Sequence, residues 1–418
     1  MFRTLKVDAA KVYLFIEFVI SLSLSMIFVV GSLYEATVAG LSPLQLVLVG
    51  TTLEISVFLF EVPTGIVADV YSRRLSIIIG YMLMGFGFLV EGSFPAFLPI
   101  VLAQVIWGLG YTFTSGTSQA WITDEVGEES ANKLFLRSTR VSLFASMIGM
   151  GLAMLVGAHN AALPIQVGAA GLILIGFTLM VIMPETGFYP TPKEDRNTWQ
   201  HMWHTFKQGV DAVRTRPRLV NIVFIGLFYG LYSEGYDRLG VKFLLDNFHL
   251  PVWFGSNHVA FFAVLSIAGN LLSIFAIRFV EKRLDTGSPL AIGRAMFVVT
   301  GLIAISLIGF AFAPLLSLAI LLGWVIDVVR SVSAPLRTAW INQKLDPNTR
   351  ATVHSLFGQV DAIGQITSGP TIGLIANALS VKLAVSISGA LLSPALFFVS
   401  RANSQSAHEA DAEPALAD

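Results

Sequence analysis

Long apolar runs, separated by short polar breaks, fill most of the chain. The runs are long enough to cross a hydrocarbon layer of roughly 30 Å as helices. Transmembrane β-strands are excluded, because the runs are too long for such strands and do not alternate polar and apolar residues. The pattern therefore predicts an all-α membrane protein with twelve spans, whose approximate limits are 12–34, 44–68, 75–93, 97–121, 135–157, 162–183, 218–239, 258–280, 290–312, 315–340, 351–378 and 382–400.

The longest break between spans divides the chain into two groups of six. We expect an N-terminal bundle over 1–183, a cytoplasmic linker over 184–217, a C-terminal bundle over 218–401 and a disordered tail over 402–418. The tail is rich in Ala, Glu, Asp and Ser, a composition typical of disorder. The linker carries Trp199, Met202, Trp203 and Phe206 at the spacing of an amphipathic helix lying along lipid headgroups.

Composition agrees with a membrane protein. Of the 418 residues 55% are hydrophobic and 13% charged, whereas a soluble domain carries about 25% charged residues. The chain has no cysteine, which excludes disulfides and thiolate chemistry. Its net charge of -1 does not favour a nucleic-acid partner, which selects clustered Lys and Arg. The first apolar run is too long for a signal peptide and lacks a cleavage site.

Basic residues predict the topology. Twelve spans place both termini on one side, and most of the 26 Lys and Arg cluster on that side. Arg330 lies deep in a span, and Arg238, Lys242 and Lys382 lie near the opposite face. The positive-inside bias makes both termini cytoplasmic. Bacterial cytoplasmic (inner) membrane and eukaryotic plasma membrane both fit, and the short termini and loops favour the bacterial one.

The two groups of spans look like copies of each other. Ala120-Trp121-Ile122 closes the fourth span, and Ala339-Trp340-Ile341 closes the tenth, 219 residues later. A parallel repeat of two six-helix bundles is typical of transporters, in which the substrate path runs between the halves near the bilayer midplane.

The loop between the second and third spans reads GIVADVYSRR, from Gly65 to Arg74. Its pattern Gly-x-x-x-Asp-x-x-x-Arg-Arg resembles the signature loop of the major facilitator superfamily. The resemblance extends over essentially the whole chain, through the twelve spans, the central loop and the duplicated halves. Val70 and Ser72 differ from the basic residue and the Gly that members commonly have there. The resemblance implies two pseudo-symmetric six-helix bundles and, by default, a monomer.

The resemblance also implies a conformational latch, in which Asp69 and Arg73 join a charge network with Asp124 at the end of the fourth span. A partly desolvated ion pair would supply a contact that can break when the bundles rearrange. The alternative is that the arginines only anchor the topology. The candidate latch residues are Glu61, Gly65, Asp69, Arg73, Arg74, Asp124 and Arg140.

Charged residues inside the spans are the other candidates, because each costs at least about 2.5–3.5 kcal/mol in hydrocarbon. Several share a helix face with further polar residues, so those faces should point inward, toward partners or water. In the family the first, fourth, seventh and tenth spans line the central cavity. The candidate substrate and proton residues are Glu17, Glu54, Tyr111, Tyr232, Glu234, Asp237, Arg238, Asp327, Arg330 and Asp361.

Structural ion pairs are the alternative explanation for these charges. Asp327 with Arg330, and Glu234 with Arg238, have the spacing of pairs within one helix. Glu54 has no basic neighbour in its own span and could exchange a proton. Asp361 could pair across helices with Arg330 or Arg337, and the sequence does not choose between them.

The wider pattern, with Glu61-Val-Pro-Thr-Gly65 and Trp121-Ile-Thr-Asp124, resembles bacterial drug and macrolide efflux members of the superfamily. This resemblance implies a secondary active transporter that works by alternating access and exports small amphipathic molecules in exchange for protons. One departure is the fifth span, which has only separate glycines where antiporters of the family often carry a Gly-Pro-Gly-rich signature.

Two other functions stay open. The first is uptake of a metabolite or organic acid by symport or facilitated diffusion, because Arg330 and Arg337 could attract a carboxylate. The second is a membrane sensor without transport. Catalysis is not expected, because the metalloprotease HExxH, the serine-nucleophile GxSxG and the phosphate-binding GxxxxGK[ST] patterns are missing. We expect no cofactor and no metal site.

Overall fold

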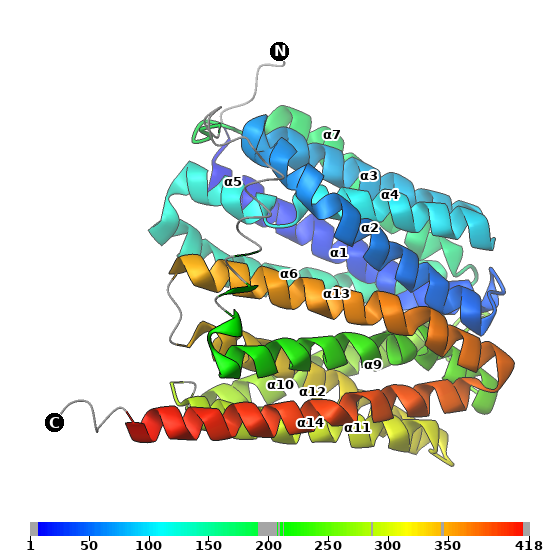
Figure 1. Ribbon diagram of the computed structural model, residues 1–418. Coiled ribbons are helices and arrows are strands. Elements are labelled where there is room, and N and C mark those ends of the chain that lie inside the picture. The colour runs from blue at the N-terminus through cyan, green and yellow to red at the C-terminus, as the bar shows by residue number, and fades with distance from the viewer. Residues whose placement is uncertain are drawn as a thin grey trace. The chain divides into compact units, whose positions relative to one another are not determined.

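The computed structural model describes residues 7–190, 207, 210, 211, 213–285, 287–343 and 347–412, with the backbone alone for 347–352 and 406–412. These residues form helices and connecting loops, and none of them lies in a strand (Figure 1). The predicted amphipathic helix of the linker, with Trp199, Met202, Trp203 and Phe206, falls outside the described residues.

Polar caps define several helix starts in the first half. Ser42 and Gln45 form a reciprocal capping box at the start of the second helix, and the Ser72 side chain caps the third. The fourth predicted span is two helices, because Gly116 adopts φ +69°, a left-handed conformation that interrupts the helix. The helices are α1 Ala9–Thr37, α2 Pro43–Val70, α3 Arg73–Ser93, α4 Phe97–Thr114, α5 Thr117–Val126, α6 Glu128–Gly157 and α7 Ala162–Ile182.

The helices of the second half agree with the predicted spans but often extend beyond them. They are α9 Pro217–Asn247, α10 Val259–Arg283, α11 Pro289–Ala311, α12 Leu316–Asn342, α13 Pro347–Ala378 and α14 Val381–Ala412. α14 continues past Arg401 into the segment that the sequence assigns to a disordered tail.

Ten described segments are long and apolar enough to cross a membrane, with α4 and α5 taken as one. Among the described helices of span length, α9 and α13 are the two outside this set. Both carry many polar residues. Polar side chains that a span cannot expose to lipid therefore make up a larger part of these two helices than of the other spans.

The described helices fall into two compact units. Unit 1 contains the described residues of Met1–Thr198 and Leu250–Ile267, and unit 2 those of Trp199–His249 and Ala268–Asp418. In unit 1, α1 packs on α6 and α7, and α3 packs on α4 and α7. In unit 2, α9 packs on α13 and α14, and α11 packs on α12 and α14. The same pairing in the same order is what a duplicated half predicts.

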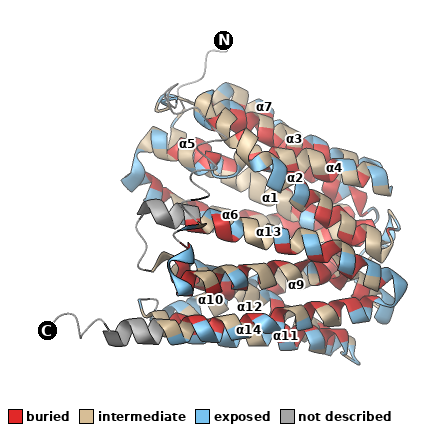
Figure 2. Ribbon diagram, in the orientation of Figure 1, coloured by how far each residue is buried: buried red, intermediate tan, exposed pale blue. Residues whose placement is uncertain are grey.

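Each unit has its own apolar core (Figure 2). The two tryptophans of the sequence repeat, Trp121 and Trp340, are both buried, with 1% and 0% of their surface exposed. The segment that precedes α10 belongs to unit 1, where the backbone N–H of Ser256 donates to the carbonyl of Ala158 at 2.7 Å.

Candidate functional site

Unit 2 contains a cavity of about 290 Å³ between α9, α12 and α13. Most of the side chains that line it are polar or charged, which is unusual for helices of span length. The lining residues are Tyr229, Tyr232, Ser233 and Asp237 from α9, Arg330, Ser333, Ala334 and Arg337 from α12, and Asp361 and Gln365 from α13.

Two glycines bring α9 and α13 close enough to share this cavity. A Cβ atom on Gly230 would lie 2.0 Å from the backbone oxygen of Asp361, and one on Gly364 would lie 2.6 Å from the backbone oxygen of Leu227. Neither position therefore has room for a side chain. Close contact of the two backbones sets the polar faces of the helices beside each other.

Asp237 and Arg330 form an ion pair between α9 and α12. The guanidinium donates to both carboxylate oxygens, with Nη2 at 2.8 Å from Oδ2. It also lies over the ring of Tyr232, at 5.7 Å from the centroid. This two-pronged geometry fixes the orientation of both charged groups. The pairing of Arg330 with Asp327 that the sequence allows is not formed, and Asp327 lies beside Tyr236 instead.

Arg337 lies about two helical turns after Arg330 on the same face of α12, and aromatic rings contact its guanidinium. Its guanidinium is 4.9 Å from the ring centroid of Tyr229 and 5.0 Å from that of Phe357. The hydroxyl of Tyr229 is fixed in turn by Thr300 at 2.9 Å and Ser333 at 3.2 Å. Arg337 is therefore well placed by cation–π contacts.

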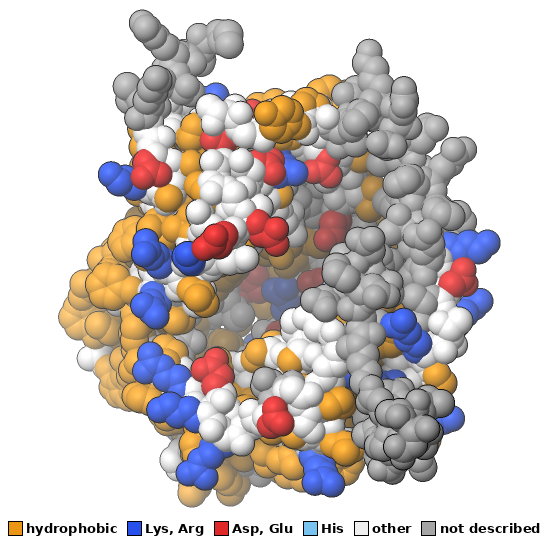
Figure 3. Space-filling view, turned by 90° about the vertical axis from the view of Figure 1, so that its left-hand side faces the viewer, with side chains coloured by type: hydrophobic (Ala, Val, Ile, Leu, Met, Phe, Trp, Pro, Cys, Tyr) orange, Lys and Arg blue, Asp and Glu red, His pale blue; other side chains and the backbone are white. Residues whose placement is uncertain are grey.

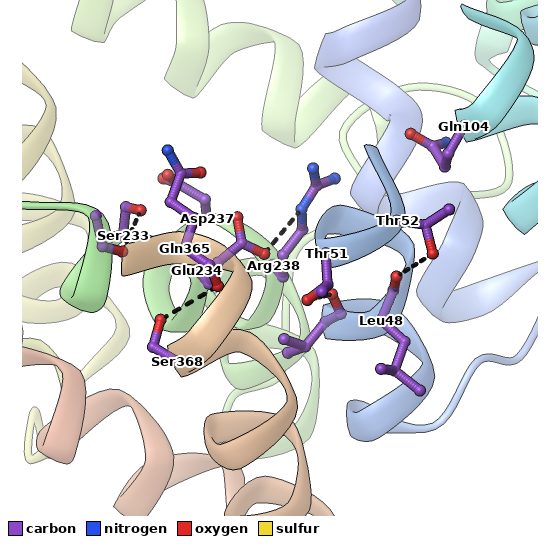
Figure 4. A network of polar contacts seen from close by, with 12 residues as sticks. Leu48, Thr51, Thr52, Gln104, Ser233, Glu234, Asp237, Arg238, Gln365 and Ser368 are labelled. Carbon is purple, nitrogen blue, oxygen red and sulfur yellow. Dashed lines mark hydrogen bonds and ion pairs between the residues drawn. The ribbon is translucent and has the colours of Figure 1, made fainter. Parts of the chain in front are cut away.

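The remaining predicted acids of unit 2 have different surroundings. The carboxylate of Asp361 accepts a hydrogen bond of 2.9 Å from Gln365 Nε2. Glu234 is buried, and its Oε2 lies 3.8 Å from Arg238 Nε, the pairing within one helix that the sequence allows. Figure 4 shows this contact on α9, with Gln365 of α13 close by.

Three predicted cavity residues belong to unit 1. Glu17 on α1 accepts a hydrogen bond of 3.0 Å from Ser142 of α6. Glu54 on α2 is half-buried. Tyr111 on α4 is 44% exposed and lies edge-on to Trp107, with 6.4 Å between the ring centroids. Trp107 also contacts Phe28 and Phe88, so these rings form an aromatic cluster in unit 1.

Some of the predicted latch residues contact one another, and others do not. Arg73 Nη1 lies 2.5 Å from Asp124 Oδ2, and Arg73 Nη2 lies 3.9 Å from Asp69 Oδ1. Figure 3 looks at the side of the molecule that lies at the left in Figure 1, and acidic and basic side chains are spread over that face. Among the described residues Glu61 and Arg140 form no ion pair with the others, and a Cβ on Gly65 would meet nothing within 4 Å. The function of the cluster as a latch stays a prediction.

A segment after α7, Met183–Phe188, extends this cluster in a way that sequence reasoning missed. Glu185 accepts hydrogen bonds from Ser72 Oγ at 2.7 Å and from the backbone N–H of Arg74 at 2.9 Å. The indole N–H of Trp121 donates to the carbonyl of Pro184 at 2.8 Å. Glu185 thereby caps the first turn of α3. Its only signal in the sequence is an acid that directly follows a helix-ending proline.

A buried polar network in unit 1 was also missed. Glu91 on α3 is 3% exposed, and its Oε2 accepts a hydrogen bond of 3.0 Å from Gln104 Nε2 on α4. The indole N–H of Trp107 donates to Gln104 Oε1 at 2.7 Å. Because Glu91 lies near the end of its span, its position in the sequence resembles that of an interfacial residue.

No group of three or more metal-ligating side chains occurs among the described residues. The polar cavity of unit 2 and the ion pairs described above are suited to binding a solute and to breaking or forming ion pairs.

Comparisons with known proteins place the fold. The family model described as Major Facilitator Superfamily matches residues 13–369. The chain is 25% identical over 343 residues to the uncharacterised MFS-type transporter YxaM of Bacillus subtilis, covering 81% of this chain and 82% of that protein. Both the family and this relative are transporters and not enzymes.

Solved structures agree with this match. The crystal structure of the nucleoside transporter NupG has a TM-score of 0.74 at 15% identity, covering 95% of this chain and 99% of that chain. A bacterial homologue of the human lysosomal transporter Spinster, in an inward-facing conformation, has a TM-score of 0.69 at 15% identity and covers 95% of each chain. At such identities these likenesses show the shared fold alone.

Proposed function

Because this chain belongs to the major facilitator superfamily of membrane transporters, we propose that it is a proton-coupled secondary transporter whose unit 2 binds a small polar molecule. The observation that carries this proposal is the cavity between α9, α12 and α13, whose lining is mostly polar and charged. A solute that forms hydrogen bonds and carries charge satisfies such a lining, whereas a lipophilic one would leave it unpaired. The proposal therefore favours the first of the two other functions that the sequence left open, uptake of a metabolite or organic acid.

Binding would be coupled to protons through one of the acids at span depth. Glu234 is buried, and its Oε2 lies 3.8 Å from Arg238 Nε. Glu54 and Asp327 are the other candidates that the sequence analysis names. We place the protein in a bacterial cytoplasmic membrane as a monomer with both termini in the cytoplasm, which is where the basic loops favour them.

The test uses the full chain reconstituted in liposomes that contain a pH-sensitive dye. Solutes that raise the thermal unfolding temperature of the purified protein are added, and proton movement is followed. We expect a binding solute to move protons in the wild type, and one of the variants Glu54→Gln, Glu234→Gln and Asp327→Asn to move the solute without protons. Glu129→Gln is the matched control, because Glu129 is 88% exposed on α6.

Proton movement that persists in all three amide variants would show that none of these acids carries the proton. Solute flux that ignores an imposed pH gradient would overturn proton coupling itself.

A second candidate function is export of amphipathic compounds, the leading hypothesis from the sequence. The aromatic cluster of unit 1 favours it, because Phe28 and Tyr111 are 55% and 44% exposed and offer ring faces to an apolar body. Accumulation of a fluorescent lipophilic cation in cells with and without the protein tests this function. Equal accumulation in both would exclude it for that class of compound.

A further inference from the structure

The charges that line the cavity of unit 2 divide into one pair in direct contact and one pair that is not in direct contact. Asp237 and Arg330 neutralise each other through two hydrogen bonds. The cavity then retains one further cation, Arg337, and one further anion, Asp361. These two groups line the same cavity and attract each other across it, but they do not form a direct ion pair.

Arg337 is held in place without a carboxylate. The guanidinium lies 4.9 Å from the ring centroid of Tyr229 and 5.0 Å from that of Phe357, and it forms no ion pair with a described residue. An aromatic ring stabilises the positive charge of the guanidinium, but it does not accept hydrogen bonds from the guanidinium N–H groups, which point outward in the plane of the guanidinium. The guanidinium therefore keeps donors for a ligand while its position is fixed.

Asp361 is oriented in a similar way by an uncharged neighbour. Gln365, one turn along α13, donates to Oδ2, and no described Lys or Arg forms an ion pair with the carboxylate. The backbone of Asp361 is pressed against Gly230, which fixes where α13 presents this side chain. The second carboxylate oxygen is left to accept a hydrogen bond from a ligand.

Both serine hydroxyls of the cavity donate to other groups. Ser233 donates to the carbonyl of Gly230 at 3.1 Å, and Ser333 donates to the hydroxyl of Tyr229 at 3.2 Å. Recognition of charge therefore depends on Arg337 and Asp361.

We propose that the cavity of unit 2 binds a small zwitterion, with its anionic group on Arg337 and its ammonium group on Asp361. A ligand with only one charge would satisfy one of these residues and leave the other desolvated without a partner, which is costly. The volume of about 290 Å³ lies at the lower end of the range for small-molecule sites, roughly 300–1,000 Å³. A ligand of the size of a free amino acid fits this limit. The inference rests on the proposed function, and it names the solute class.

The experiment measures binding to the purified full-length chain by isothermal titration. The probes are free amino acids, their N-acetyl forms, which lack the cation, and their carboxamide forms, which lack the anion. We expect at least one free amino acid to bind about tenfold or more tighter than either of its derivatives, the effect of losing one hydrogen-bonded charge contact.

Two variants assign the charges. Arg337→Gln should remove the preference for a free carboxylate, so that an amino acid and its carboxamide bind alike. Asp361→Asn should remove the preference for a free amine, so that the amino acid and its N-acetyl form bind alike. Arg337→Lys keeps the cation and should keep the carboxylate preference at lower affinity. Arg294→Gln, an exposed residue on α11, is the control and should change neither preference.

Three results would overturn the inference. One is an N-acetyl form that binds as tightly as its parent, which would make the site a simple anion site. Another is a charge preference that Arg337→Gln and Asp361→Asn leave unchanged. The third is a panel in which no free amino acid binds, whatever else the protein transports. In that third case proton-coupled flux of another solute would leave the proposed function standing.

Discussion

Unit 1 and unit 2 pair their helices by the same scheme, but they carry their inter-helix ion pairs in different places. In unit 1 the pair of Arg73 and Asp124 lies where α3 begins and α5 ends. In unit 2 the pair of Asp237 and Arg330 lies within α9 and α12, away from the helix ends, and lines a cavity. The two units have thus placed this inter-helix ion pair near the helix ends in one copy and within the helices in the other.

The repeated tryptophans show the same divergence. The indole N–H of Trp121 donates to the carbonyl of Pro184, in the segment that follows α7. At Trp340 a different group forms the contact, because its backbone carbonyl accepts a hydrogen bond of 2.8 Å from Arg218 Nη2. Equivalent positions are therefore equally buried but have different partners. Under the proposed function unit 2 would bind the solute, and the ion pair of unit 1 is the predicted latch.

The largest effect is expected from adding a side chain at the glycines where two helix backbones are in close contact. Gly230→Ala would place a Cβ 2.0 Å from the backbone of Asp361, and Gly149→Ala would place one 2.4 Å from the carbonyl of Leu22 between α6 and α1. Each should destabilise the protein by roughly 1–3 kcal/mol or more, through overpacking. The unfolding temperature in detergent measures this effect.

Gly358→Ala on α13 and Gly151→Ala on α6 are matched controls, because a Cβ there meets nothing within 4 Å. Both should be neutral or slightly stabilising. Gly230→Ala should also weaken solute binding, whereas Gly149→Ala should leave it nearly unchanged. Equal loss of binding in the two variants would contradict the division between the units.

The next effect concerns the ion pair of unit 2. Asp237→Asn or Arg330→Gln leaves one charge of the cavity uncompensated, so transport in liposomes should fall about tenfold or more. The double variant Asp237→Arg with Arg330→Asp restores opposite charges and should recover part of that activity. Failure of the reversed pair to exceed the single variants would mean that position, and not charge balance, controls the site.

A smaller effect is expected in unit 1. The side chains of Arg73 and Asp124 are 19% and 28% exposed, so their pair should contribute roughly 0.5–1 kcal/mol. Asp124→Asn should shift the conformational equilibrium by about two- to fivefold if the pair is a latch.

The chain has no cysteine, so a single cysteine in place of Tyr111 reports this shift through its rate of thiol labelling. Glu129→Gln removes an exposed pair on α6 and is the control. An unchanged labelling rate in Asp124→Asn would leave the arginines as topology anchors.

The smallest effect is expected at the cap of α3. Glu185→Gln keeps one acceptor but removes the negative charge at the helix start, which should cost about 0.5 kcal/mol. Hydrogen exchange at the first amides of α3 should accelerate about twofold. Glu281→Gln, exposed on α10, is the control. Equal exchange in both variants would show that Glu185 does not cap α3.

The sequence was sufficient for the existence and order of the helices, because each apolar run is long and its ends are polar. It did not show the break at Gly116, because the predicted fourth span runs from 97 to 121 and passes straight through the polar stretch Thr114-Ser115-Gly116-Thr117-Ser118. It named Asp237 and Arg330 separately but did not pair them, because the contact joins two helices and depends on their rotation. Sequence spacing gives only neighbours on the same helix, such as Glu234 and Arg238.

Residues that act through the tertiary structure were the hardest to find. The sequence named Arg337 as a residue that could attract a carboxylate, but its support by Tyr229 and Phe357 comes from two other helices and was not visible. Glu185 acts across more than a hundred positions, on the start of α3. Contacts between residues this far apart in the sequence leave no periodic pattern from which they could be predicted.

The polarity of α13 has a consequence for how the protein is made. This helix, with Asp361, Gln365 and Ser368 on it, falls short of the hydropathy that a membrane-crossing helix needs by itself. When it leaves the ribosome, partition into lipid alone would not hold it there. Its insertion should therefore depend on α9 being already in place, so that the close backbone contact at Gly230 and Gly364 can shelter its polar face during biogenesis.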